Sequence, residues 1–162
     1  MGIARNERRT EPALTPLIAL KLIHILAAIT AVGANVTYSF WLQAAGTDRD
    51  RLVFVIGSVR RLDRRIANPA YGVLLITGIL MILTGAYSFQ TGWIDAAIVL
   101  YVGVAIIGAA AFGPAIRRQL AEATRDPGSP EYAAAARTAS RLGLLTTGIV
   151  LVIIVLMVAK PS

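Results

Sequence analysis

The sequence predicts an all-α membrane protein, a four-helix transmembrane bundle with an amphipathic cytoplasmic helix between spans one and two. Mean hydropathy is high, at +0.67, and charged residues make up only 15% of the chain. The charges are confined to the segments between long apolar runs, a segregation typical of transmembrane proteins. A length of 162 residues allows one compact bundle. We therefore expect a polar N-terminal tail over residues 1–16 and a single four-span membrane domain over residues 17–162.

The first span is predicted over residues 17–43, with Thr15 as its N-cap and Pro16 at the first helical position. Such a helix is roughly 40 Å long, enough to cross the bilayer with some tilt. It carries the chain's only histidine on a stripe of small and polar residues that we expect to face the bundle. This stripe consists of His24, Ala27, Ala31, Asn35 and Tyr38.

The segment over residues 48–66 is predicted to form the amphipathic helix, with Thr47 or Asp48 as its cap. Apolar residues recur at helical spacing on one face, and arginines occupy the flanks and the opposite face. It is too charged to span a bilayer. We expect it to lie in the membrane interface or to extend the second span into the cytoplasm.

The remaining spans are predicted over residues 67–89, 93–116 and 141–159. Pro69 and Pro114 mark a helix start, end or bend, because proline is tolerated best in the first turn. Small residues at regular spacing predict faces where a neighbouring helix approaches closely. These are Gly78 and Gly85 in one span and Ala105, Ala109 and Gly113 in the next. A polar loop is expected over residues 119–129. The helix that becomes the last span is expected to begin at Ser129-Pro130-Glu131.

The net charge of +7 comes mainly from arginines beside the predicted spans, which favours anionic lipid over nucleic acid as the partner. The two long connections carry eleven arginines, against four basic residues, Arg5, Arg8, Arg9 and Lys160, flanking the spans on the other side. This asymmetry predicts cytoplasmic connections and both termini outside the cytoplasm. Within the first connection lies a cluster of basic residues that could contact lipid or a partner protein, or simply flank the span. The cluster comprises Arg60, Arg61, Arg64 and Arg65. We expect Asp63 between them to pair with an arginine one turn away.

His24 is the one candidate cofactor ligand, because an ionisable residue inside a span indicates a functional site. Its imidazole could ligate haem iron or bind copper, and the alternative is a neutral histidine hydrogen-bonded across helices. Without cysteine, thiolate metal sites are excluded. One histidine cannot supply two haem ligands within one chain, which leaves a five-coordinate haem, a methionine partner (Met81 or Met157) or a site shared between chains.

Asn35 and Tyr38 are the intramembrane polar residues, and we expect them to form interhelical hydrogen bonds. A substrate path is the alternative. Paired carboxylates are missing from every predicted span, which argues against a proton-coupled transporter. A small-solute transporter would also need an aqueous cavity.

Several short motifs in fixed order resemble a known family. They are LKLIHILAAITAVGA, RRLDRRIANPA, LLITGILM, TGW and the terminal LMVAKP. The chain, from about Leu17 to Pro161, is similar to the bacterial predicted integral membrane proteins of domain-of-unknown-function family 2269. Members often carry a tryptophan at the entry to the last span, where this chain has RTASRLGLL. The resemblance implies four helices in a bacterial inner membrane and no established activity. A distant likeness, at the level of fold, extends to copper-resistance protein D and to the HemJ type of protoporphyrinogen oxidase.

These observations favour a non-catalytic accessory, scaffold or assembly subunit of the bacterial inner membrane over an enzyme. We expect it to bind membrane lipids and another membrane protein or a second copy of itself. The alternative is a haem- or copper-linked redox or transport protein that uses His24.

Overall fold

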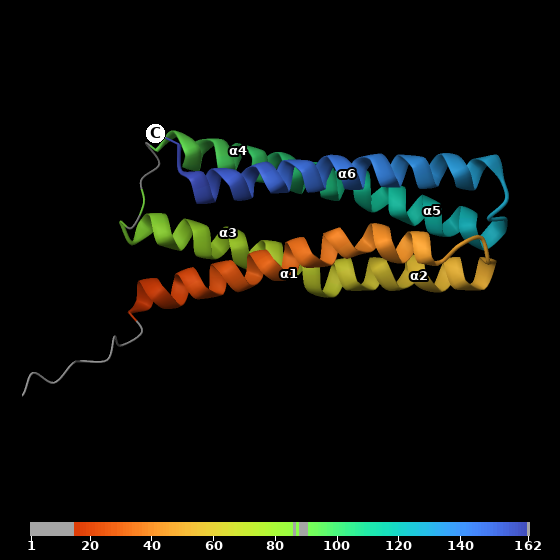
Figure 1. The fold of residues 1–162 in the computed structure, drawn as a ribbon, viewed down its shortest axis with the longest axis horizontal. Helices are drawn as coiled ribbons and strands as arrows, with labels where there is room; N and C mark the ends of the chain where they lie inside the picture. The colour runs from red at the N-terminus through yellow and green to blue at the C-terminus, as the bar shows by residue number, and fades with distance from the viewer. Residues whose placement is uncertain (1–14, 86, 88–90, 162) are drawn as a thin grey trace, which may run out of the picture.

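The computed structural model describes residues 15–85, 87 and 91–161, and these form four long helices lying side by side (Figure 1). No strand occurs among them, and each long helix is long and apolar enough to cross a membrane. The predicted four-helix transmembrane bundle is thus confirmed. The first and last long helices are α1 (Pro16–Ala44) and α6 (Pro130–Ala159). The second joins α2 (Arg49–Leu62), the π-helical turn η1 (Asp63–Ala67) and α3 (Asn68–Leu83). The third joins α4 (Gly92–Ile107), the π-helical turn η2 (Gly108–Phe112) and α5 (Gly113–Arg125).

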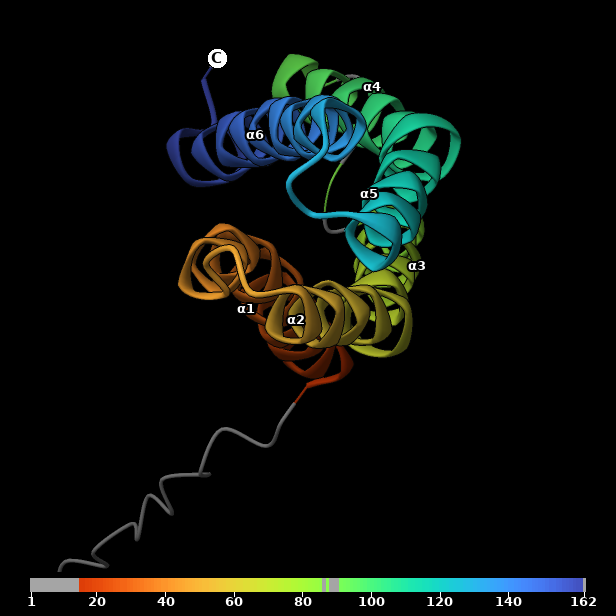
Figure 2. The same ribbon diagram turned by 90° about the vertical axis from the view of Figure 1, so that its right-hand side faces the viewer.

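The helices form two layers. In one layer α1 packs along α3, and in the other α6 packs along α4 and α5. The layers meet chiefly where α2 contacts α5, with a smaller contact between α1 and α6 (Figure 2). The start of α1 and the end of α6 lie at one end of the bundle, and the α1–α2 and α5–α6 connections lie at the other (Figure 1). We call the latter the arginine-rich end, because all eleven described arginines lie on α2, η1, α5 and the first half of α6.

Three helices begin at the caps that the sequence predicts. The Thr15 hydroxyl accepts a hydrogen bond from the Ile18 amide at 3.4 Å. The Asp48 carboxylate accepts one from the Arg51 amide at 2.8 Å. The Ser129 hydroxyl accepts one from the Tyr132 amide at 3.1 Å. Each cap satisfies a backbone donor that the first helical turn leaves without a partner.

Pro69 and Pro114 each follow a π-helical turn, and neither ends its helix. Proline lacks the amide donor and its ring crowds the carbonyl four residues before it, so a widened turn accommodates it inside a continuous helix. The amphipathic segment therefore runs through η1 into α3 and prolongs the second long helix. Its place in the membrane interface and on the cytoplasmic side stays a prediction.

The predicted polar loop over residues 119–129 is wrong. Helix α5 continues to Arg125, and only residues 126–129 form the turn. The helix persists because Ile116 and Ala123 are buried on the face that α5 presents to its neighbours. Helix α3 ends at Leu83, and Gly85 follows it with a left-handed φ of +74°. Residues 1–14 of the predicted tail lie outside the described residues. So do residues 86, 88 and 89, at the end of the span predicted over residues 67–89.

A small apolar core fixes the arginine-rich end. Ile56 of α2 is fully buried and belongs to one cluster with Ile116 and Ala123 of α5 and Ala139 of α6. This cluster joins the two layers, so the spacing between them depends on it.

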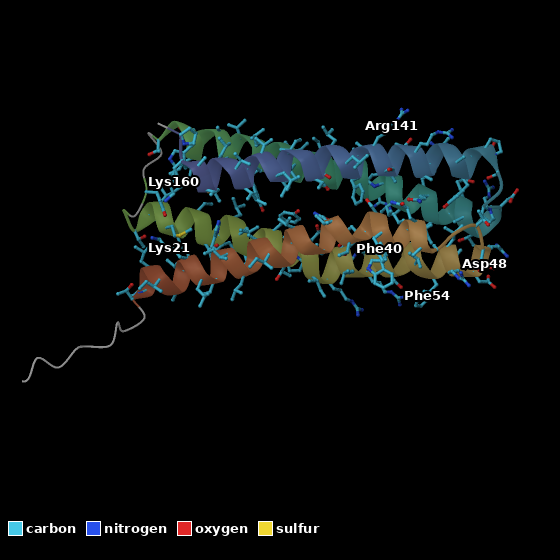
Figure 3. The ribbon with its side chains drawn as sticks, in the orientation of Figure 1. Lys21, Phe40, Asp48, Phe54, Arg141 and Lys160 are labelled. Atoms are coloured by element: carbon cyan, nitrogen blue, oxygen red, sulfur yellow. The ribbon has the colours of Figure 1, made fainter. Side chains whose placement is uncertain are left out.

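We predict that Ile56→Ala lowers the free energy of unfolding by about 2–5 kcal/mol, because it opens a cavity where α2, α5 and α6 meet. Phe54→Ala on the same helix is the control, since that ring is 67% exposed (Figure 3). The measurement is reversible unfolding in mild detergent. Equal losses in the two variants would show that this cluster does not hold the layers together.

Candidate functional site

A central cavity of about 790 Å³ lies between the two layers. Every α-helix of the bundle contributes to its lining, and so do both π-helical turns. Its volume falls in the range of small-molecule sites, which is roughly 300–1,000 Å³. This cavity was not predicted from the sequence. It is the candidate functional site.

One wall of the cavity is polar. It consists mainly of side chains from α1, η1 and α3, including both of the polar residues predicted to lie inside the membrane. These lining residues are Asn35, Tyr38, Ser39, Gln43, Asp63, Arg64, Asn68 and Tyr71. The stripe predicted to face the bundle is confirmed at three positions, because Ala27, Ala31 and Tyr38 are the buried residues of α1.

Hydrogen bonds join this wall across three helices. The Asn35 amide of α1 donates to the Tyr71 hydroxyl of α3 at 2.5 Å. The Tyr101 hydroxyl of α4 donates to the Tyr71 backbone carbonyl at 2.6 Å, and the two rings stand edge to face with centroids 6.4 Å apart. The predicted interhelical bonding of Asn35 is thus confirmed, and Tyr71 is its centre.

The opposite wall consists largely of small residues on α4, η2 and α6. Ala105 and Ala109 belong to the series predicted to allow close approach of a neighbouring helix, yet both are exposed and line the cavity. Their small side chains leave space at mid-bundle. Apolar groups such as Val104, Phe112 and Leu144 complete this wall, so the cavity has a polar side and a mainly apolar side.

Two buried polar atoms in the lining have no hydrogen-bond partner among the described residues. They are the hydroxyl of Tyr38 and the side-chain oxygen of Gln119. The predicted interhelical hydrogen bond of Tyr38 is therefore wrong. Tyr38 is only 5% exposed and Gln119 only 4%. A buried polar group without a partner costs about 1–3 kcal/mol, so each such atom calls for a specific explanation.

The charged lining comes from three pairs of adjacent arginines, and one member of each pair lines the cavity. We call Arg60, Arg64 and Arg117 the cavity arginines. Their neighbours, which are not among the lining residues, we call the outward arginines. These are Arg61, Arg65 and Arg118. The predicted basic cluster thus divides between two environments.

The predicted ion pair of Asp63 is wrong. Its carboxylate accepts a hydrogen bond from the Asn68 amide at 3.3 Å. Within the described part of the chain, the one ion pair closer than 4.0 Å joins Arg125 to Glu122 at 3.8 Å. The π-helical geometry of η1 offers the reason, because it changes the rotation between Asp63 and the neighbouring arginines from that of an α-helix. The cavity arginines therefore have no carboxylate partner among the described residues.

His24 lies outside the cavity lining, at the contact between α1 and α3. Its Nδ1 is 2.8 Å from the Thr77 hydroxyl, and a Cβ at Gly78 would lie 3.5 Å from its Cε1. A side chain as small as alanine at this position would therefore make an ordinary van der Waals contact with the imidazole. The described residues contain no group of three or more histidine, cysteine, aspartate and glutamate side chains that could hold a metal ion. A haem or copper role of His24 stays a prediction.

Both lysines of the chain, Lys21 and Lys160, lie near the ring of Tyr87, at the end of the bundle opposite the arginine-rich end. Lys21 of α1 and Lys160 at the end of α6 lie with their ammonium groups 5.8 and 5.7 Å from the centroid of the Tyr87 ring (Figure 3). These cation–π contacts link the two layers at this end.

Four long apolar helices with polar groups turned inward define a polytopic α-helical integral membrane protein. Residues 18–161 match the model of a family described as "Predicted integral membrane protein (DUF2269)". The chain belongs to this family. No curated protein and no solved structure matched it. The more distant likenesses to copper-resistance protein D and the HemJ type stay predictions.

We predict that Asn35 and Tyr71 are energetically coupled. In a double-mutant cycle with Asn35→Ala and Tyr71→Phe, we expect a coupling energy of about 0.6–1.7 kcal/mol, the range found for hydrogen bonds between membrane helices. The measurement is unfolding in detergent micelles. Strictly additive losses would contradict the bond.

Proposed function

We propose that this protein is a non-catalytic accessory protein of a bacterial inner membrane that binds a lipid-like amphiphile inside its helix bundle. The observation that carries the proposal is the central cavity, with its polar wall on α1, η1 and α3 and its mainly apolar wall on α4, η2 and α6. A molecule with one polar end and one apolar part matches both walls.

The setting of the cavity favours a ligand that enters from the membrane. The helices around it expose many large apolar side chains, such as Ile29, Val99 and Val155, as a lipid-facing surface does. The cavity is not enclosed. Its lining includes Arg64 of η1 and Arg117 of α5, which belong to the arginines predicted to face the cytoplasm. Basic residues that flank spans are commonly placed at the membrane surface, so a polar headgroup bound beside these arginines would lie near the headgroup region of the bilayer.

The lining residues favour binding over chemistry. Asp63 is the one carboxylate among them, and the other polar groups are amides, hydroxyls and guanidinium groups. Such groups orient and hold a ligand, whereas general acid–base chemistry commonly uses histidine or a pair of carboxylates. Binding to another membrane protein or to a second copy remains part of the proposal through the exposed apolar faces.

We predict that Ala105→Phe, which fills the cavity, reduces the amphiphile retained after purification in mild detergent by at least about tenfold. Ile106→Phe is the control, because Ile106 is the next residue on α4, is 61% exposed and is not a lining residue. Mass spectrometry of the intact complex and of its extracted lipids measures retention. Equal retention in the two variants would place the bound molecules outside the cavity.

The arginine-rich end should face the cytoplasm, because basic flanks are retained on that side. We therefore predict that alkaline phosphatase fused after the last helix is active, and that the same enzyme fused in the α5–α6 connection is inactive. Activity assays in intact cells measure both fusions. The reverse pattern would invert the orientation.

A further inference from the structure

We infer that the cavity recognises a phosphate-bearing anionic headgroup. The inference rests on the proposed function and adds the chemistry of the ligand. Its first support is charge, because three cavity arginines against the single Asp63 leave a formal charge of +2 in the lining. Arg60 is half-buried, and Arg64 and Arg117 are exposed, so the three guanidinium groups are open to an anion that enters the cavity.

The second support is that the cavity arginines have no acidic partner in the described part of the chain, where the only close ion pair lies elsewhere. The Asp63 carboxylate is engaged by Asn68 instead. The side chain of Arg117 lies along its own helix, with Nη1 3.6 Å from where a Cβ at Gly113, another lining residue, would stand. Guanidinium groups match the geometry of phosphate oxygens and form strong charge-assisted hydrogen bonds with them.

The third support comes from the two buried polar atoms without partners. The Tyr38 hydroxyl can donate a hydrogen bond to a phosphate oxygen, and the Gln119 oxygen can accept one from a hydroxyl group on the headgroup. Both residues belong to the same lining as the cavity arginines. A phosphate diester that carries a hydroxylated headgroup offers the acceptor oxygens and the hydroxyl donor that these groups call for.

The arginine pairs supply matched variants for the test. One variant replaces the cavity arginines by glutamine, as Arg60→Gln, Arg64→Gln and Arg117→Gln together. The other replaces the outward arginines in the same way, as Arg61→Gln, Arg65→Gln and Arg118→Gln together. Both remove three positive charges from adjacent positions on the same helices, so general electrostatic attraction to a membrane falls equally in each.

The experiment measures the affinity of the delipidated full chain in mild detergent, by native mass spectrometry, for three probes. They are dioleoyl-phosphatidylglycerol, dioleoyl-phosphatidylcholine, and water-soluble glycerol 3-phosphate. We expect the wild type to prefer phosphatidylglycerol over phosphatidylcholine by about tenfold or more, as contacts with a charged group imply. The cavity variant should lose this preference, and the outward variant should keep it.

A preference that survives in the cavity variant, or that falls equally in both variants, overturns the inference. Equal binding of the two lipids by the wild type overturns it too, while leaving the proposed function standing. Glycerol 3-phosphate that binds as tightly as phosphatidylglycerol supports the phosphate chemistry but assigns it to a soluble ligand and overturns the lipid proposal. Binding of none of the three probes overturns both. If the triple cavity variant does not fold, Arg117→Gln against Arg118→Gln decides in the same way.

Discussion

The structure depends on one constraint, which is that a membrane cannot solvate polar groups on the lipid-facing side of a helix. The chain meets it in two ways: the exposed Thr30 and Thr37 hydroxyls donate to carbonyls of their own helix, and other polar side chains turn inward. Asn35, Tyr71 and Tyr101 satisfy one another across three helices. Small residues on the facing helices leave room around them. The result is an apolar bundle with one polar wall in its interior, and the cavity borders that wall.

The two prolines place this polar interior at mid-bundle. Each follows a π-helical turn, and both turns contribute residues to the cavity lining. A π-helical turn changes the rotation of the helix by inserting one residue into its period, so it alters which side chains face inward on its two sides. Before Pro69, the turn brings Asp63 and Arg64 to the cavity. Before Pro114, it brings glycine and alanine, which leave the space that the polar wall borders.

Local patterns in the sequence were sufficient to predict four long apolar helices and three of their caps, because a cap depends on residues within one turn. Thr15, Asp48 and Ser129 show this. Local patterns did not predict that α5 continues to Arg125. The cavity was beyond such reasoning, because it depends on which faces of separate helices meet. Tyr71 lies in a different long helix from Tyr101 and Gln119, and no spacing along the chain relates residues of separate helices. Rarity directed attention to His24, whereas the structure places that residue in the contact between α1 and α3.

The paired arginines show how one sequence feature can serve two purposes. Adjacent residues on an α-helix point about 100° apart, so Arg60 and Arg117 can line the cavity while Arg61 and Arg118 do not. The same division holds for Arg64 and Arg65 in η1. The outward arginines suffice to explain the basic flank that sets orientation in a membrane. They do not explain the cavity arginines, which line a space that also contains the buried hydroxyl of Tyr38 and the buried oxygen of Gln119. Membrane orientation requires positive charge at this end of the bundle. It does not require that this charge line a cavity, nor that the cavity contain buried polar atoms without hydrogen-bond partners. Arginines that line a cavity together with such polar atoms are what a binding site for an anion requires.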